Sequence, residues 1–341
     1  MSSILAPVDL APAPTRDHAD LARSITRAAS TQTYGTIRLL ADRDRAADAY
    51  RAYAYFRWVD DQLDDGTALP AERAAFLARQ QALLNAGYAG RSLPAGLAAE
   101  ETLLAELIAA DTEPDSGLRS YLGHMMAVMA FDVARRETGR RGRAISAAEL
   151  AEYSRLLATA VGDALFHFIG HDCQPPRDPA RYAALRGAHI IHMLRDTAED
   201  AALGYINVPA ELLTANGLLT VNGLLTVNGL DVGDLGAVLF DRPAFREWVA
   251  ARVALARRDF AIGRRLIEGL ACRRCRLAGY AYIARFEYVA GLIERDGYRL
   301  RAAYPERQSR AAALWMARRT AAGILRPRRQ DNGALRPAME R

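Results

Sequence analysis

Apolar residues recur every three or four positions along nearly the whole chain, from about Asp17 to Arg326. The sequence is rich in alanine, leucine and arginine, and alternating runs of β-branched residues are scarce. This period places apolar side chains on one face of an α-helix, whereas a strand needs strict alternation. Because 51% of the 341 residues are hydrophobic, the chain can bury a large core. We therefore predict an all-α fold built as a single helical bundle.

Glycine, proline and helix-capping residues interrupt the helical pattern at several places. The interruptions are at residues 65–72, 85–96, 111–117, 138–146 and 171–181. None is long enough to mark a domain linker, so we predict one helical domain over residues 21–325. A flexible tail is expected at residues 1–20 and a disordered tail, rich in arginine and proline, at residues 326–341. The tandem repeat of NGLLTV predicts a loop lengthened by duplication at residues 216–230.

The basic residues limit the chemistry that the chain can perform. All 45 of them are arginine, because the sequence contains no lysine. Schiff-base catalysis and the Walker-type phosphate loop both need a lysine, so these two classes are excluded. The net charge of +5 suits anionic small molecules, but it is too diffuse to indicate nucleic-acid binding.

The three cysteines are too few for a disulfide framework. With no secretory signal at the start of the sequence, we expect a cytoplasmic protein. No apolar run reaches the roughly 18 residues of a membrane span, although the arginine-rich tail could contact an anionic membrane surface. Cys272 and Cys275 form a lone CxxC, which we interpret as an arginine-rich helix turn rather than a zinc or redox motif.

Two acidic clusters lie in otherwise apolar, helix-forming sequence. Like charges one helical turn apart cost a few tenths of a kcal/mol per pair, so a group outside each helix should compensate them. Each cluster follows an arginine, Arg57 or Arg195. The first cluster consists of Asp60, Asp61, Asp64 and Asp65, and the second of Asp196, Glu199 and Asp200.

Ionisation of a diphosphate is the chemistry that needs two such clusters. Carboxylates from two facing helices can hold Mg²⁺, which completes its coordination with water and substrate phosphates. The metal and nearby arginines stabilise the departing diphosphate, and an apolar cavity protects the allylic carbocation from water. Aromatic residues near the clusters could line that cavity, or could equally be core residues. They are Tyr53, Phe56, Phe166 and Phe168.

A carboxylate-bridged di-iron bundle is the alternative metal protein. It requires a Glu-x-x-His pair on each of two helices, and no histidine here has a glutamate three residues before it. His167 and His171 have the spacing of zinc ligands but lack the glutamate of HExxH. We interpret both as core or cavity residues.

At these acidic residues the sequence resembles the squalene/phytoene synthase family of prenyltransferases. YAYFRWVDDQLDD resembles the first aspartate-rich motif of that family, and MLRDTAED followed by GYINVPAELL resembles the second. Between them, LAEYSRLLATAVGDALFHFIG is similar to a family helix that begins at a tyrosine. STQTY lies where the family has a diphosphate-contacting stretch, and YIARFEYVAGLIERDGYRL resembles its closing helix. The likeness runs from about residue 26 to 305.

The resemblance implies an isoprenoid-synthase-type helical bundle with a central cavity, Mg²⁺ as cofactor and an allylic isoprenyl diphosphate as substrate. The residues that match the metal positions of the family are Asp60, Asp61, Asp64, Asp196 and Asp200. Those that match its diphosphate contacts are Arg57, Tyr53, Thr31 and Thr33. Further candidates for substrate binding are Arg195, Tyr205, Asn207, Phe56 and Phe166. Asp65 and Glu199 match acidic positions whose role is less defined.

The sequence departs from the family pattern around the second motif. His189 and His192 replace a glutamine and an asparagine, and the stretch from Gly204 to Pro209 lacks the usual arginine and tyrosine of Gly-Arg-x-Tyr-x-Pro. Because the metal aspartates are intact while these positions differ, we expect ionisation to be retained and the second substrate to be altered. Neutral drift is the alternative explanation. A neutral histidine at either position could accept the proton released when an aromatic ring captures the cation.

Three functions follow from this pattern. We favour a Mg²⁺-dependent prenyltransferase of natural-product biosynthesis that acts on a second small-molecule acceptor, an aromatic one. Head-to-head condensation of two isoprenyl diphosphates to a phytoene- or squalene-type product is the alternative, because it is the commonest activity of the family. A non-catalytic binding or assembly factor is the third, and it would be expected to have lost metal aspartates that this chain retains.

Overall fold

The predicted all-α fold is confirmed. The computed structural model describes residues 16–136, 144–173, 175, 177–203, 205–215, 217 and 239–326, and within them every regular element is helical. The longer helices are α1 (Arg16–Ala29), α2 (Thr31–Leu40), α3 (Ala46–Asp64), α4 (Pro70–Tyr88), α5 (Ala99–Ala110), α6 (Gly117–Arg136), α7 (Ala147–Phe168), α8 (Ala183–Ala202), α11 (Pro243–Gly269), α12 (Arg273–Arg295) and α13 (Arg310–Ile324). The shorter ones are α9 (Ala210–Ala215) and the 3₁₀ turns η1 (His171–Cys173), η2 (Pro179–Tyr182) and η4 (Pro305–Gln308).

Several helices end where the sequence predicts interruptions. α3 ends just before the predicted break at residues 65–72, and the breaks at 85–96, 111–117 and 171–181 likewise separate successive helices. Local capping explains the start of α7. The Ser146 hydroxyl accepts from the Glu149 amide at 3.1 Å, while the Glu149 carboxylate accepts from the Ser146 amide at 2.8 Å. This capping box satisfies backbone donors that the first turn of α7 would otherwise leave unpaired.

The N-terminal boundary differs from the prediction, because α1 already begins at Arg16. A contact from the first turn of α1 to α5 accounts for the difference, since His18 Nδ1 lies 2.6 Å from Glu106 Oε1. The remainder of the predicted N-terminal tail, residues 1–15, lies outside the described residues. So do residues 327–341 of the predicted C-terminal tail and, apart from Gly217, the predicted loop at 216–230.

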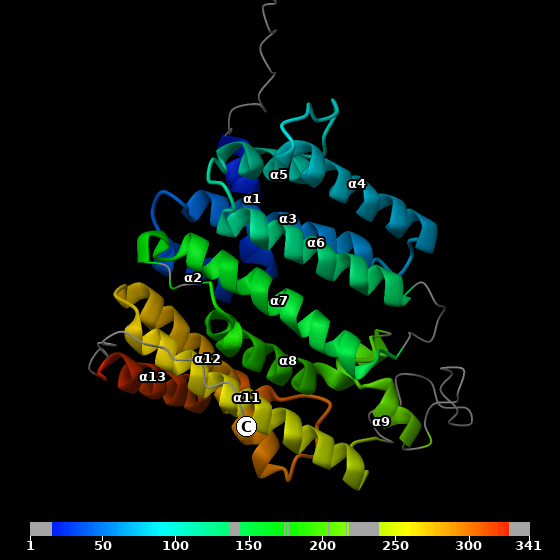
Figure 1. Cartoon of the computed structure of the whole chain (residues 1–341), viewed down its shortest axis with the longest axis vertical. Coiled ribbons are helices and arrows are strands. Elements are labelled where there is room, and N and C mark those ends of the chain that lie inside the picture. Colours follow the sequence, from blue (N-terminus) through cyan, green and yellow to red (C-terminus); the bar gives the residue numbers. More distant parts are fainter. Residues whose placement is uncertain are drawn as a thin grey trace, which may run out of the picture.

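The helices stack in layers (Figure 1). α4 and α5 lie at one end, followed by α3 and α6, then α7, and then α8 with α11, α12 and α13 at the other end. α6 packs on α7, and α8 packs on both α7 and α11. In the described part of the chain, no helix is both long and apolar enough to cross a lipid bilayer.

Two apolar clusters hold the layers together. The first gathers residues of α3, α5 and α6, among them the fully buried Tyr55 and Leu103. The second gathers residues of α8, α11 and α12, including Ile190 and Phe260. Burying such a side chain contributes about 1.5–3 kcal/mol. Because each cluster fixes one half of the bundle, α3 and α8 are held in place from opposite sides.

Candidate active site

Two aspartates from each acidic cluster line one cavity of about 180 Å³. Asp60 and Asp64 come from α3, and Asp196 and Asp200 from α8. Within each helix the two aspartates are four residues apart, so they project from the same face. The structure thus brings together four of the five aspartates that the sequence predicts as metal ligands.

Several further residues line this acidic cavity. The predicted His189, His192, Tyr205 and Asn207 are among them. Sequence reasoning did not select Asp132 and Arg135 on α6, or Tyr153 and Leu157 on α7. Asp132 and Arg135 could have been found in the sequence, because they are an acid and an arginine three residues apart in an otherwise apolar helical stretch.

Hydrogen bonds tie the segment after α8 to both acidic clusters. The Tyr205 hydroxyl donates to Asp64 Oδ1 at 2.6 Å, and the Asn207 amide donates to Asp200 Oδ2 at 2.7 Å. Arg135, only 3% exposed, contacts Asn207 Oδ1 and Asp132 Oδ1, each at 2.7 Å. A buried guanidinium therefore lies in the wall of the acidic cavity, and its centre is 4.5 Å from the Tyr205 ring.

The cavity carboxylates have perturbed acidities. Burial, together with the neighbouring Asp64, raises the pKa of Asp60 to about 6. Burial and the charge of Asp196 likewise raise the pKa of Asp200 to about 6. Asp196 differs: burial alone would raise its pKa, but hydrogen bonds from Arg195 and His192 lower it below its usual range. The raised values mean that the negative charges of the cavity are incompletely compensated by the protein.

This donor set fits Mg²⁺. The facing carboxylate oxygens are hard ligands of the kind that Mg²⁺ prefers, and the cavity leaves room for water or phosphate oxygens to complete its coordination. A bound dication would also favour the ionised form of Asp60 and Asp200, which the metal-free protein disfavours.

Asp61 lies outside the acidic cavity. Arg57 Nε donates to Asp61 Oδ2 at 3.1 Å, and Arg57 Nη1 donates to Asp60 Oδ2 at 3.2 Å. The Asp61 side chain is 51% exposed, because it lies one residue from Asp60 and so projects about 100° further round the helix. Asp65 and Glu199 are also exposed and do not line the cavity.

An apolar chamber of about 470 Å³ adjoins the acidic cavity and shares Asp60 and Leu157 with it. The predicted Tyr53, Phe56, Arg57 and Thr33 line this chamber, as does Phe168. Thr31 is exposed at the first position of α2 and lines none of these cavities. Arg195 is buried behind the acidic cavity, where its Nε donates to Asp196 Oδ1 at 2.5 Å.

A second apolar cavity, of about 160 Å³, adjoins the apolar chamber. The predicted Phe166 lines this second cavity and lies under the guanidinium of Arg181, 4.4 Å from the ring centre. The chamber and the second cavity share six lining residues, namely Gln32, Thr36, Leu165, Ile169, Tyr282 and Arg285.

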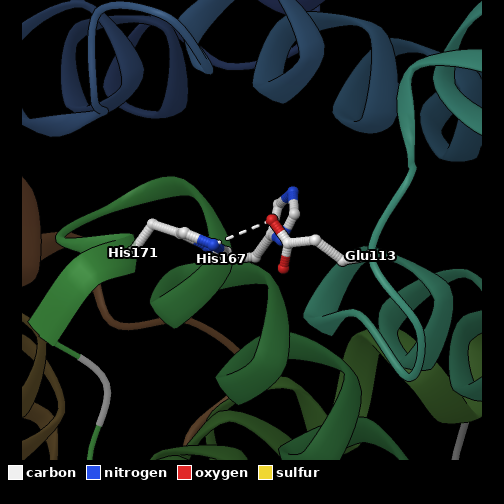
Figure 2. A group of neighbouring side chains, drawn as sticks. All are labelled: Glu113, His167 and His171. Atoms are coloured by element: carbon white, nitrogen blue, oxygen red, sulfur yellow. Dashed lines mark ion pairs between the residues drawn. The ribbon is translucent and has the colours of Figure 1, made fainter.

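Glu113, His167 and His171 form a separate cluster, in which one nitrogen or oxygen atom from each lies within 4.8 Å of the others (Figure 2). His171 Nε2 is 2.9 Å from Glu113 Oε1. Arg45 donates to the same carboxylate oxygen at 2.8 Å and lies 2.9 Å from His167 Nε2. Burial lowers the pKa of His167 to about 4, so this histidine is neutral near pH 7. Because Arg45 already supplies a cation here, we interpret the cluster as an ion-pair network, not a metal site.

The fold is a helical bundle of the isoprenoid-synthase type. A family model for squalene/phytoene synthase matches residues 26–315, and the chain belongs to this family. Its members process isoprenyl diphosphates as prenyltransferase-type enzymes.

Two solved structures share the fold. The squalene synthase HpnC from Alicyclobacillus acidocaldarius has 22% sequence identity and a TM-score of 0.61, covering 87% of this chain and 98% of its own. A dehydrosqualene synthase in complex with a ligand has 15% identity and a TM-score of 0.62, covering 90% of this chain and 95% of its own. No curated protein sequence matches the chain.

Proposed function

We propose that the protein condenses two isoprenyl diphosphates head to head. The proposal reverses the order of preference drawn from the sequence, which placed an aromatic acceptor first. The family to which the chain belongs is described by squalene and phytoene synthesis, and both reactions join two prenyl chains. The arrangement of the cavities supports the same reaction.

The observation that carries the proposal is one acidic cavity beside two connected apolar ones. The chamber of about 470 Å³ shares Asp60 and Leu157 with the acidic cavity. The second apolar cavity, of about 160 Å³, shares Tyr282 and Arg285 with the chamber. Two apolar chains could therefore extend from a common region near the carboxylates, as a condensation of two prenyl groups requires.

We assign metal binding to Asp60, Asp64, Asp196 and Asp200, which line the acidic cavity from two helices. When bound, Mg²⁺ would supply charge stabilisation for the departing diphosphate. Arg57 lies at the edge of the chamber next to Asp60 and offers a further positive charge to the same group. Tyr205 holds one oxygen of Asp64, which fixes the orientation of that carboxylate.

The apolar walls would protect the carbocation. Phe56, Tyr121 and Met125 line the chamber beyond Asp60 and exclude water from it. After the two chains join, the remaining positive charge is discharged either by loss of a proton or by hydride from NADPH. The first route gives a phytoene-type product and the second a squalene-type product.

The chain lacks the arginine and the tyrosine of the family pattern Gly-Arg-x-Tyr-x-Pro, but a guanidinium and a phenol are still present beside the second motif. Arg135 places a guanidinium next to Asn207, and Tyr205 places a phenol against Asp64. An arginine and a tyrosine thus still contact this side of the cavity from different positions. We infer that the second motif can still serve an isoprenoid substrate.

The test uses the purified protein with Mg²⁺ and dimethylallyl, geranyl, farnesyl or geranylgeranyl diphosphate separately, each with and without NADPH. Released diphosphate and extractable hydrocarbons are measured. A hydrocarbon of twice the donor chain length is expected from one of the four, and it should disappear in Asp60→Asn and Asp196→Asn. Tight Mg²⁺-dependent binding of a donor without such a product would reject the condensation, and no binding at all would favour a non-catalytic role.

Transfer to an aromatic acceptor is the second candidate, because His189 lines the acidic cavity and its buried Nε2 has no hydrogen-bond partner among the described residues. The His189 ring lies 5.5 Å from that of Tyr153. Burial lowers the pKa of His189 to about 3, which makes it a poor proton acceptor. Its role would be to hydrogen-bond a polar group of the acceptor. Under this function, donor turnover would begin only when an aromatic compound is added, and His189→Ala would reduce that turnover.

A further inference from the structure

All three cysteines of the chain gather around one turn after α7. A Cβ at Gly170 would lie 2.2 Å from Cys275 Sγ and 3.0 Å from Cys272 Sγ, so both sulfurs face the same small space. Gly170 has a φ of +68°, which favours glycine, and any side chain there would overlap Cys275. Cys173 follows on the same turn, where its amide donates to the Gly170 carbonyl at 2.9 Å.

Cys272 and Cys275 occupy the first turn of α12. Cys272 is the N-cap residue, and its sulfur accepts from the Cys275 amide at 3.4 Å. Cys275 is buried and its thiol donates to the Ile169 carbonyl at 3.1 Å. Cys272 is partly exposed and therefore accessible to a small reagent. The pair thus combines an accessible sulfur at a helix N-terminus with a buried thiol beside it.

The two sulfurs also differ in acidity. Burial opposes ionisation of Cys272, but hydrogen bonds from the Cys275 and Arg274 amides and the charge of Arg274 lower its pKa below the ordinary value. Burial and the neighbouring Cys272 raise the pKa of the Cys275 thiol. An acidic, accessible thiol attacks a disulfide, and a buried partner then resolves the mixed disulfide.

We propose that Cys272 and Cys275 form a redox-active dithiol that is converted reversibly to an intramolecular disulfide by exchange with a low-molecular-weight disulfide. The Cys272 thiolate attacks one sulfur of that disulfide and releases one thiolate. The Cys275 sulfur, on losing its proton, then attacks Cys272 Sγ and releases the second. Overall the protein loses two electrons and two protons, and the reagent becomes two thiols.

The position of the pair connects this chemistry with the apolar cavities. Cys275 lines the second cavity together with Ile169 and Leu270. The disulfide would remove the thiol hydrogen that Ile169 accepts at the C-terminal end of α7. Ile169 also lines the larger chamber, so oxidation would alter a wall that both cavities share.

The experiment equilibrates the reduced full-length protein with glutathione and oxidised glutathione at a series of ratios. The samples are quenched with acid, their remaining thiols are alkylated after unfolding, and intact masses are measured. We expect two thiols to disappear together while one remains. Cys173→Ser is the matched control and should lose both of its thiols in the same way. Cys275→Ser should instead accumulate a glutathione adduct on Cys272.

Two results would overturn the proposal. One is wild-type protein that keeps all three thiols at every ratio, and the other is a Cys173→Ser variant that no longer forms the bridge. Because a variant can fold poorly, the rates of thiol alkylation are also measured on the folded wild-type protein. Iodoacetamide should modify Cys272 at least about tenfold faster than Cys275, in line with its thiolate character. Equal rates at the two sites would also count against the dithiol.

Discussion

The Tyr205 hydroxyl donates to Asp64 Oδ1 at 2.6 Å, across a separation of 141 residues in the sequence. This bond joins the segment after α8 to the end of α3 and closes one side of the acidic cavity. The bond holds a carboxylate that lines the acidic cavity. Its contribution should therefore be visible in metal binding as well as in turnover.

Tyr205→Phe removes only this hydroxyl. A hydrogen bond to a charged group contributes about 1.5–3 kcal/mol, so we expect a loss of turnover of about 10–10² with a higher Mg²⁺ requirement. Diphosphate release measured against Mg²⁺ concentration checks both effects. Tyr288→Phe is a suitable control, because the Tyr288 ring makes an edge-to-face contact with Trp315 and lines none of the cavities described. Equal activity of wild type and Tyr205→Phe at limiting Mg²⁺ would show that the bond does not orient Asp64.

The sequence was sufficient to predict the fold class and to place the aspartates of each pair on one helix face. Helical periodicity is a local property, and an i, i+4 pair such as Asp60 and Asp64 must share a face wherever the helix lies. Arg135 could not be found in this way, because its place next to Asn207 depends on how α6 packs beside the segment after α8. Asp61 matched a motif by spacing, yet the rotation of α3 turns it outward to Arg57.

The cysteines illustrate the same limit. A lone CxxC indicates little by itself. The structure adds the information that the backbone of Gly170, just after α7, lies next to both sulfurs. That contact joins residues more than 100 positions apart, so no local pattern could reveal it.

The position of Asp61 gives a prediction that separates it from its neighbours. Asp60→Asn and Asp196→Asn each remove a cavity carboxylate and should lower turnover by about 10²–10³, the usual cost of losing one electrostatic contact to the transition state. Asp61→Asn removes an exposed partner of Arg57 and should cost less than about tenfold. Rates of diphosphate release at saturating Mg²⁺ compare the three variants. A loss for Asp61→Asn as large as that for Asp60→Asn would place Asp61 among the metal ligands.

Mg²⁺ binding should weaken as the pH falls through about 6. The pKa values of Asp60 and Asp200 are raised to about 6 in the folded protein, so below that pH protons compete with the metal for these carboxylates. In the metal-free protein the sign is the reverse. Above pH 6, the burial and mutual repulsion of the ionised Asp60 and Asp200 lower the free energy of unfolding. As the pH falls from 6 towards 4, these carboxylates take up protons in the folded protein and the free energy of unfolding rises. The increase in melting temperature on adding Mg²⁺ should therefore be larger at pH 7.5 than at pH 5.5. Asp60→Asn should make the Mg²⁺-induced increase in melting temperature less dependent on pH. An unchanged dependence would show that protonation of Asp60 does not cause it.

Glu101 provides a prediction about stability that is independent of the active site. Its carboxylate accepts from Arg79 Nε at 2.6 Å and from the Gln80 amide at 2.8 Å, and it caps α5 through the Ala98 amide at 3.0 Å. The hydrogen bonds from Arg79 outweigh the effect of burial and lower the pKa of Glu101 to about 2.

Glu101→Gln should lower the free energy of unfolding by about 1–3 kcal/mol at neutral pH. Because the folded pKa is depressed, this contribution is complete above the unfolded value near 4.5 and is lost as the pH falls towards 2. Urea unfolding of wild type and variant at several pH values measures the difference, which should shrink through that window. Glu100→Gln, one residue away and without this set of bonds, should change the stability by less than about 0.5 kcal/mol. If both variants lost the same stability, the effect would belong to the helix terminus and not to the contacts of the Glu101 carboxylate.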